Sequence, residues 1–467
     1  TPTARPSRLT VGVDRGCLTS AGGPRTVSEV RLARWLSRPP YLLVAAAAAL
    51  PRLAALLYER GDILAAFTDK SDDFARVFVE SGTYGLIPGI PSAYTQPLYG
   101  FFLVPIYATV GRHWWAVGLA QIGVAAATAL LVYEVARRVV SPRAGVVAAL
   151  LATLHPYLVW HDVHLNREIL DGLLAAALVL VALLAEERPT ALRAALLGGI
   201  AGLAILGNAR LALLPFLLVA WLLARRGLSR RTASLGLVVL AAAAFVVSPW
   251  VVRNRVSVGC LTLTTDARAL WKANNLSTYR VLAGGGWIDD VPDLPGAPPT
   301  PEMAGALYRE TGRVLRLDEC AQMRLYQGEV VRFWREHPGE KLRLAGQAAS
   351  MLWQPTVHET RGRPGKGTWL DRARRLGEPL YMASLYAAAV FGLVAASRRL
   401  LGLALALLAY QTALAMLFAG ATRYRVPWDF LVAVMAAAGL RALALRLERP
   451  GRELGRALLR RPSGQAP

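Results

Sequence analysis

Three aspartates lie close together in TDKSDDFARVFVESG, residues 68–82: Asp69, Asp72 and Asp73. A carboxylate that loses part of its hydration has a raised pKa, which suits it to remove a proton from a hydroxyl group. Three neighbouring carboxylates also repel one another, so we expect a cation beside them. The alternative is a solvated acidic loop without catalytic function. Because the group follows a long apolar run by only a few residues, its position favours a general base at a membrane surface.

A second group of polar side chains lies in HPYLVWHDVHLNREILDG, residues 155–172. His161 and His164, three residues apart, have a spacing that can bind a metal ion together with Asp162 or Asp69. Histidines that only form hydrogen bonds at an interface are the more frequent case, so we predict no metal site.

Arginines stand at the ends of several apolar runs. Arg167 and Glu168 begin one run, where the bilayer penalises ionisable residues and their presence indicates a function or, alternatively, a structural pair. Four more arginines lie where other runs begin or end: Arg210, Arg253, Arg423 and Arg425. Such residues can simply anchor a helix at the membrane interface. Because arginine binds phosphate through two parallel hydrogen bonds, their number at one face favours a phosphate-binding site.

These residues belong to a chain of 467 residues that is 54% hydrophobic and 18% charged, which is too apolar for soluble domains. Three cysteines exclude a disulfide scaffold and a cysteine-rich metal site. The net charge of +22 comes largely from short loops and tails, which favours membrane orientation over nucleic-acid binding. We predict ten spans, at 41–58, 115–136, 144–160, 167–185, 192–208, 210–224, 232–252, 379–396, 400–419 and 426–446.

One further apolar run, 97–111, is short for a span and contains two prolines. If it does not cross, every arginine-rich short loop and both tails lie on the cytoplasmic side, as the positive-inside rule requires. We therefore predict an interfacial or re-entrant helix there and two cytoplasmic termini. The run at 41–58 is predicted to be an uncleaved anchor, since the basic tail before it has no signal-peptide core.

This topology predicts an all-α polytopic membrane protein of about ten transmembrane helices, with interfacial helices and an α-rich extracytoplasmic insertion. In the insertion we predict a loop at 287–303 and an amphipathic helix at 324–338. Cys260 and Cys320 both lie there and can pair in an oxidising compartment if they are close enough. The predicted parts are a basic cytoplasmic tail (1–40), a transmembrane module (41–252) with the first outer loop (59–114), the extracytoplasmic domain (253–376), C-terminal transmembrane helices (377–446) and a second basic tail (447–467).

The motifs, in this order, resemble the GT-C type glycosyltransferases that use polyprenyl-phosphate sugars, in particular the bacterial group related to protein O-mannosyltransferases and lipid A aminoarabinose transferases. The resemblance lies in DKSDDFARVFVESG, QPLYGFFLVPIYATVG, HPYLVWHDVHLNREILDG, GLAILGNARLALLPFLL, SPWVVRNRVSVG, LWKANNLSTY, FWREHPGEKLRL and RYRVP. The chain has Asp69-Lys70 where the mannosyltransferases have an Asp-Glu pair, and Ala273-Asn274-Asn275 where Gly-Asn-Asn is familiar. These departures leave the sugar and the acceptor open.

The resemblance implies a cell-envelope enzyme of the bacterial inner membrane, with its active site at the outer leaflet. A first-loop carboxylate, Asp69 or the Asp72–Asp73 pair, would be the base, and the transfer would invert the anomeric carbon. Its partners would be a polyprenyl-phosphate sugar donor, a saccharide, lipid or protein acceptor, and membrane lipids, with no nucleic acid. A phosphate diester leaves well, so no cofactor is required. We assign donor-phosphate binding to Arg210, Arg253, Arg423 and Arg425, and substrate binding to His161, His164, Arg167, Glu168, Asn274 and Asn275.

Two other functions would use similar arginines: a transporter or flippase for a lipid-linked sugar, and a ligase that transfers whole glycans from a pyrophosphate carrier. A transporter predicts broken helices and charged residues near the bilayer midplane. The polar groups of this chain gather instead at one membrane edge, which favours a one-sided enzyme.

Overall fold

The computed structural model describes residues 40–65, 68–356 and 369–459. The chain divides into two units, 1–40 and 41–467, and all described helices lie in the second. Cys17 and most of the predicted N-terminal tail fall outside the described residues. Among those residues every regular element is a helix, and the prediction of an all-α polytopic fold is confirmed.

Seven described helices contain segments long and apolar enough to cross a membrane. They are α2 (Tyr41–Glu59), α5 (Trp114–Val139), α8 (Glu168–Glu187), α11 (Arg230–Ser257), α17 (Trp369–Ala395), α18 (Arg398–Leu417) and α20 (Asp429–Leu459). The predicted count of ten spans is not confirmed, because three predicted runs form shorter helices.

The shortening has local causes. The run at 144–160 splits into α6 (Pro142–Thr153) and α7 (Pro156–His161), because a helix is disfavoured at the residue before Pro156. The run at 192–208 is the 17-residue α9 (Ala191–Gly207). The run at 210–224 begins with a 3-10 turn, Ala209–Leu213, so α10 (Leu214–Arg226) has only 13 residues.

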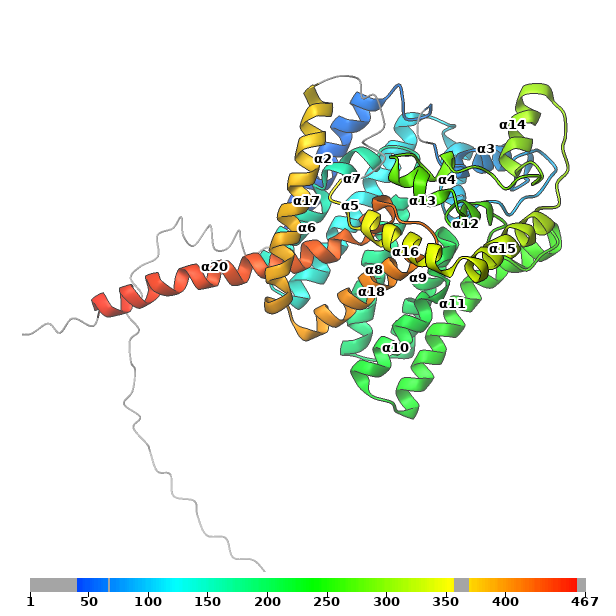
Figure 1. Ribbon diagram of the computed structural model, residues 1–467. Helices are drawn as coiled ribbons and strands as arrows, with labels where there is room; N and C mark the ends of the chain where they lie inside the picture. The colour runs from blue at the N-terminus through cyan, green and yellow to red at the C-terminus, as the bar shows by residue number, and fades with distance from the viewer. Residues whose placement is uncertain (1–39, 66–67, 357–368, 460–467) are drawn as a thin grey trace, which may run out of the picture. The chain divides into compact units, whose positions relative to one another are not determined.

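The remaining helices connect and cover the bundle. The short run at 97–111 forms α4 (Pro97–Thr109), as predicted, and the predicted amphipathic helix forms within α15 (Glu319–Glu336). Figure 1 shows α3 and α14 side by side, far from α10. The others are α3 (Ser71–Ser81), α12 (Arg268–Lys272), α13 (Thr278–Ala283), α14 (Pro301–Thr311), α16 (Pro338–Leu352) and α19 (Thr422–Arg425), with 3-10 turns at Ile288–Asp290 and Val426–Trp428.

Small residues allow α9 and α11 to approach closely. A Cβ atom at Gly198 would lie 2.1 Å from the carbonyl oxygen of Val239, and one at Gly202 would lie 2.9 Å from that of Ala243. Two glycines four residues apart form the small-residue stripe on which membrane helices pack. Large apolar side chains such as Phe245 remain exposed on the other faces, as expected for lipid contact. α9, which precedes the turn at Arg210, and α11, which carries Arg253, are therefore tightly packed against each other.

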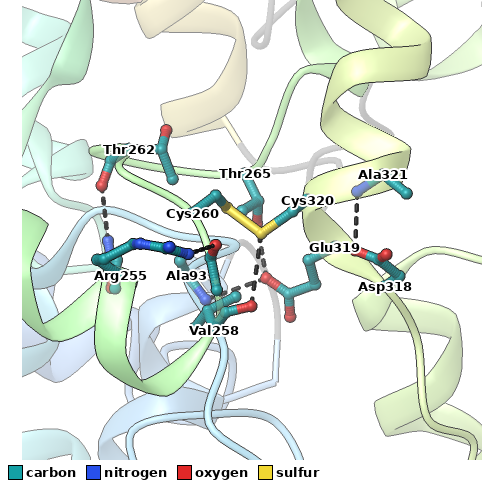
Figure 2. The surroundings of a disulfide bond; sticks show 12 residues. Ala93, Arg255, Val258, Cys260, Thr262, Thr265, Asp318, Glu319, Cys320 and Ala321 are labelled. Carbon is teal, nitrogen blue, oxygen red and sulfur yellow. Dashed lines mark hydrogen bonds between the residues drawn. A yellow bond between two sulfur atoms is a disulfide. The ribbon is translucent and has the colours of Figure 1, made fainter.

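Cys260 and Cys320 form a disulfide with a Cα–Cα distance of 5.9 Å, which confirms that they can pair. The bond joins the segment after α11 to the first turn of α15 (Figure 2). Beside it, Oε2 of Glu319 accepts hydrogen bonds from the N–H of Ala93 (3.1 Å) and Oγ1 of Thr265 (2.6 Å). The segment around Ala93 is thus attached, next to the disulfide, to Thr265 and to the start of α15.

Candidate active site

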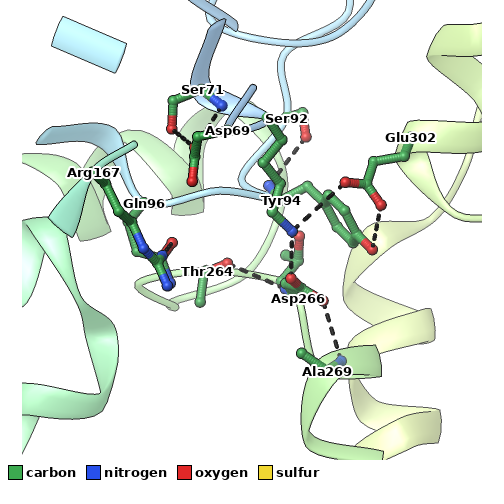
Figure 3. Close-up of polar contacts among 12 residues, drawn as sticks. Asp69, Ser71, Ser92, Tyr94, Gln96, Arg167, Thr264, Asp266, Ala269 and Glu302 are labelled. Atoms are coloured by element: carbon green, nitrogen blue, oxygen red, sulfur yellow. Dashed lines mark hydrogen bonds and ion pairs between the residues drawn. The ribbon is translucent and has the colours of Figure 1, made fainter. Parts of the chain in front are cut away.

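Asp69 immediately precedes α3 and is held by its backbone and one carboxylate oxygen. Its N–H donates to Leu165 O (2.8 Å), and its Oδ1 accepts from the N–H (2.9 Å) and Oγ (2.6 Å) of Ser71. Among the residues that the structure describes, none donates a hydrogen bond to Oδ2 of Asp69. Figure 3 shows this oxygen pointing away from Ser71. Asp69 is therefore fixed in place and offers one oxygen to a ligand.

Asp72 is buried and fully engaged by neighbouring side chains. Arg112 holds it through two parallel bonds, Nε to Oδ1 at 2.9 Å and Nη2 to Oδ2 at 2.7 Å. The hydroxyl of Tyr107 donates to Oδ1 at 2.6 Å. A carboxylate with both oxygens paired to an arginine is poorly suited to accept a proton from a substrate.

Asp73 lies at the surface and pairs with two arginines, Arg76 of the same helix at 2.7 Å and Arg309 of α14 at 3.0 Å. Such exposed pairs contribute about 0.2–1 kcal/mol each. The structure thus separates the three aspartates into three environments, and the cation expected beside them is an arginine in two of the three. Asp69 is the first-loop aspartate that remains available as a base.

Three half-buried arginines form the arginine cluster, defined as Arg167, Arg210 and Arg423. The guanidinium of Arg210 lies 3.6 Å above the ring of Tyr424, and that of Arg423 lies 5.0 Å from the same ring. Arg167 donates from Nη1 to Oε1 of Gln96 at 2.5 Å. The cluster joins the residue before α8 (Arg167), the 3-10 turn before α10 (Arg210) and α19 (Arg423), so each arginine lies next to an apolar run.

Electrostatic interactions link Asp69 to this cluster. Burial acts to lower the pKa of Arg167, but the carboxylates of Glu168, Asp69 and Asp171 outweigh it and raise that pKa. Burial lowers the pKa of Arg210, and the positive charges of Arg167 and Arg423 lower it further. The three guanidinium groups therefore lie close enough to repel one another, which is the condition under which an anion is bound.

Two buried carboxylates, those of Glu168 and Asp171, lie next to the arginine cluster. Oε1 of Glu168 is 3.7 Å from Nε of Arg423, and its Oε2 is 3.9 Å from Nε2 of His161. Oδ2 of Asp171 accepts from Nδ2 of Asn208 at 3.4 Å. Oδ1 of Asp171 has no hydrogen-bond partner among the described residues. Asp171 was not among the sequence-predicted site residues, although it lies in the quoted motif.

The structure does not bring the other two predicted arginines into the cluster. Arg253 donates to the carbonyl oxygens of Ser92 and Tyr84, at 2.8 Å each, and so holds the first outer loop against α11. Arg425 is buried, pairs with Asp429 through two nitrogens at 2.8 and 3.2 Å, and also donates to the carbonyl oxygens of Leu352 and Gln354. Both guanidinium groups are therefore used within the protein.

The histidines are placed as hydrogen-bonding and packing groups. Burial lowers the pKa of His161 to about 4, and its ring packs 4.7 Å from that of Tyr157. Nδ1 of His164 lies 3.0 Å from the carbonyl oxygen of Trp160. Asp162 instead forms a buried ion pair with Arg52 at 2.8 Å. In the described part of the chain no three His, Cys, Asp or Glu side chains are grouped to hold a metal ion.

Asn274 and Asn275 lie buried within the 253–376 domain. Oδ1 of Asn274 accepts from Nε1 of Trp334 (2.9 Å) and Nζ of Lys341 (2.6 Å), and its Nδ2 donates to two carbonyl oxygens. Asn275 bonds to Trp271 O and to the N–H of Ser277. Both amides therefore form hydrogen bonds within the protein, and the bond from Asn274 to Leu417 O joins this segment to α18.

A polar group that the sequence did not indicate borders Asp69. Nζ of Lys70 lies 2.6 Å from Asp266 and 3.8 Å from Glu302, and 4.4 Å above the ring of Tyr94. Burial acts to lower the pKa of Lys70, but Asp266 and Glu302 raise it. In the sequence only the position of Lys70 next to Asp69 indicates this group, because the partners of Lys70 lie some 200 residues away.

A mainly apolar groove of about 600 Å³ is lined by residues of α3, α4, α9 and α11, with Arg253 among them. Its wall includes Leu98 and Leu206, which lie close in sequence to Gln96 and Asn208 of the polar site. Phe101 and Trp250 line its length, and their rings lie 6.2 Å apart. The groove is large enough for part of an isoprenoid chain.

Comparisons with known proteins bear on the fold of the chain. Residues 95–252, which include Arg167 and Arg210, match the family model described as dolichyl-phosphate-mannose-protein mannosyltransferase. The oligosaccharyltransferase of Archaeoglobus fulgidus in its apo form superposes with a TM-score of 0.50 at 14% identity, over 91% of this chain and 52% of that one. The chain has the GT-C fold.

The GT-C resemblance inferred from the motifs is thereby confirmed, and the matched family is one of glycosyltransferases, as predicted. The chain spans about half the length of the archaeal enzyme. ArnT of Cupriavidus metallidurans bound to undecaprenyl phosphate is also similar, with a TM-score of 0.41 and 16% identity over 85% of this chain and 77% of that one. No curated protein sequence matches the chain.

Proposed function

We propose that this GT-C protein transfers a sugar from a polyprenyl-phosphate donor to an acceptor hydroxyl group on the extracytoplasmic side of a bacterial inner membrane. The observation that carries the proposal is that Asp69, which has one carboxylate oxygen available, lies near Arg167 of the arginine cluster (Figure 3). A base and an anion site side by side are what acid–base transfer from a phosphate leaving group requires. The match of residues 95–252 to the mannosyltransferase family supports the donor class.

The reaction follows from these positions. Oδ2 of Asp69 takes the proton of the acceptor hydroxyl as its oxygen attacks the anomeric carbon. The bond between that carbon and the phosphate oxygen breaks on the opposite face, so the configuration inverts. The electron pair stays on the polyprenyl phosphate, whose added negative charge the arginine cluster stabilises. Because the phosphate leaves as a stable anion, we expect no metal requirement.

The apolar groove between α4, α9 and α11 is the proposed site of the polyprenyl chain. Phe101, Leu98 and Leu206 would contact isoprene units, while the phosphate reaches the arginines. Burying such a chain contributes about 0.8 kcal/mol for each methylene group removed from water. Within the membrane this gain is smaller, so the groove serves to align the phosphate.

The side of the membrane is inferred from the disulfide. Disulfides persist in oxidising compartments and are rare in the cytosol. The bond between Cys260 and Cys320 therefore supports an extracytoplasmic location for the 253–376 domain and for the first outer loop attached to it. With the arginine-rich loops on the other side, both termini would be cytoplasmic.

The test is a donor-consumption assay with purified protein in lipid nanodiscs. A panel of polyprenyl-phosphate monosaccharides is offered together with membrane extracts as the acceptor source. We expect one donor to be consumed with release of one polyprenyl phosphate per sugar transferred. If every donor in the panel is left intact and none binds, the proposed function is wrong.

A further inference from the structure

Buried carboxylates next to the arginine cluster reduce its positive charge, although a site that only binds phosphate does not need them. Buried Glu168 lies 3.7 Å from Arg423, and the carboxylates of Glu168 and buried Asp171 both act on Arg167. With both carboxylates ionised, the three arginines and these two residues carry a net charge of +1, and Asp69, which also acts on Arg167, lowers the positive charge further. A site that only maximised phosphate affinity would keep the full +3 of the arginines.

The geometry of Glu168 differs from that of a structural ion pair in the same protein. Asp429 meets Arg425 at 2.8 Å with two parallel hydrogen bonds, and both side chains are buried. Glu168 stands 3.7 Å from Arg423, whose side chain is about one-third exposed. At this distance, without a parallel pair of hydrogen bonds, Glu168 acts on the cluster mainly through its charge.

The donor and the product of the proposed reaction differ in charge. A sugar phosphate diester carries one negative charge, whereas the released polyprenyl phosphate is a monoester with a charge of about −1.5 to −2 at pH 7. Repulsion by a fixed carboxylate grows in proportion to the ligand charge. A carboxylate beside the arginines thus penalises the product about 1.5 to 2 times as strongly as the donor.

We propose that Glu168, supported by Asp171, is a specificity-determining residue that matches the arginine cluster to a monoanionic phosphodiester and weakens the binding of the dianionic monoester product. The proposal rests on the proposed function, because it assumes that the arginine cluster binds the donor phosphate. Its consequence is faster release of polyprenyl phosphate after transfer.

The test compares two lipids that differ by one ester bond, undecaprenyl phosphate and its methyl ester, for binding to the full chain in nanodiscs. Removing the charge in Glu168→Gln is expected to strengthen monoester binding by about 10- to 100-fold and to strengthen diester binding less. Glu168→Asp keeps the charge and should keep the wild-type ratio of the two affinities. Product inhibition of turnover should increase in Glu168→Gln and not in Glu168→Asp.

A matched control lies at the other end of the same helix. Glu186 of α8 is also buried and also pairs with arginine, Arg225 at 2.8 Å, but lies outside the site. Glu186→Gln is expected to leave the affinity ratio unchanged. If neither lipid binds the wild type, the proposed function fails. If both bind and Glu168→Gln leaves their ratio unchanged, or loses both, then Glu168 only positions the arginines and the inference is overturned.

Discussion

Arg112 holds Asp72 in a bidentate ion pair, with Nη2 2.7 Å from Oδ2 and Nε 2.9 Å from Oδ1. This pair joins the start of α3 to the segment after α4. Arg112 also donates a hydrogen bond to Leu64 O (3.0 Å), which lies between α2 and α3. Because Asp72 is committed in this way, the pair determines which aspartate can serve as a base. It also predicts separate effects on stability and on turnover.

Breaking this pair is expected to destabilise the protein. Arg112→Ala leaves a buried carboxylate without its partner, which costs about 3–5 kcal/mol for a fully buried pair and less here because Arg112 is about one-third exposed. Thermal unfolding in detergent measures the effect. Arg76→Ala, which removes a surface pair of Asp73, is the control and should change the unfolding free energy by less than about 1 kcal/mol.

Arginine-to-lysine variants should fall into two classes. In Arg210→Lys and Arg423→Lys the planar fork is lost, so we expect at least a roughly tenfold weaker binding of a polyprenyl-phosphate lipid with an unchanged unfolding temperature. In Arg425→Lys the bidentate pair with Asp429 is lost, so the unfolding temperature should fall. Binding and unfolding curves recorded on the same preparations distinguish the classes. Equal lipid affinity in the wild type and the first two variants would remove the arginine cluster as the phosphate site.

The disulfide is expected to stabilise the 253–376 domain. Removing a native disulfide typically costs about 2–5 kcal/mol, so Cys260→Ser should lower the unfolding temperature. A reductant should lower the temperature of the wild type toward that of the variant. The double variant Cys260→Ser, Cys320→Ser is the control, and a further decrease on adding reductant to it would show that another effect is being measured.

Two buried histidines predict a loss of stability in acid. Burial lowers the pKa of His155 and of His161 to about 4, whereas the unfolded chain binds these protons near pH 6.5. Unfolding therefore takes up protons between these values, so stability is full above pH 6.5 and falls as the pH approaches 4. Lowering the pKa of one histidine from 6.5 to about 4 corresponds to about 3 kcal/mol.

The measurement is the unfolding temperature as a function of pH for the wild type and His161→Gln. The variant should have a shallower decrease between pH 6.5 and 4, because one of the two protonation sites is absent. A decrease of equal steepness in both proteins would assign the acid sensitivity to other groups.

Much of the fold could be predicted from the sequence because apolar runs and loop charges are local signals. The helices at 97–111 and 324–338 formed as expected for this reason. The helices predicted at 144–160 and 210–224 were longer than those observed. Pro156 and the 3-10 turn at Arg210 interrupt the helix without interrupting the apolar pattern.

The candidate site was predicted only in part because its partners are distant in sequence. The sequence could place Asp69, Arg167 and Arg210 near one membrane edge, but it could not show which of the charged residues already pair within the protein. Arg425 and Asp429 are only four residues apart, so the helical spacing alone could have predicted their ion pair. The pairing of Lys70 with Asp266 had none.

The most direct test of the central claim is the turnover of Asp69→Asn by comparison with its binding of donor. Asparagine keeps the size of the side chain and its bonds with Ser71 but does not take up a proton at neutral pH. Removal of a positioned base typically lowers the rate by about 10² to 10⁴. We therefore expect sugar transfer to fall by that factor while donor affinity and unfolding temperature stay at wild-type values, and Asp73→Asn to retain normal turnover. Wild-type turnover by Asp69→Asn would contradict the assignment of Asp69 as the base.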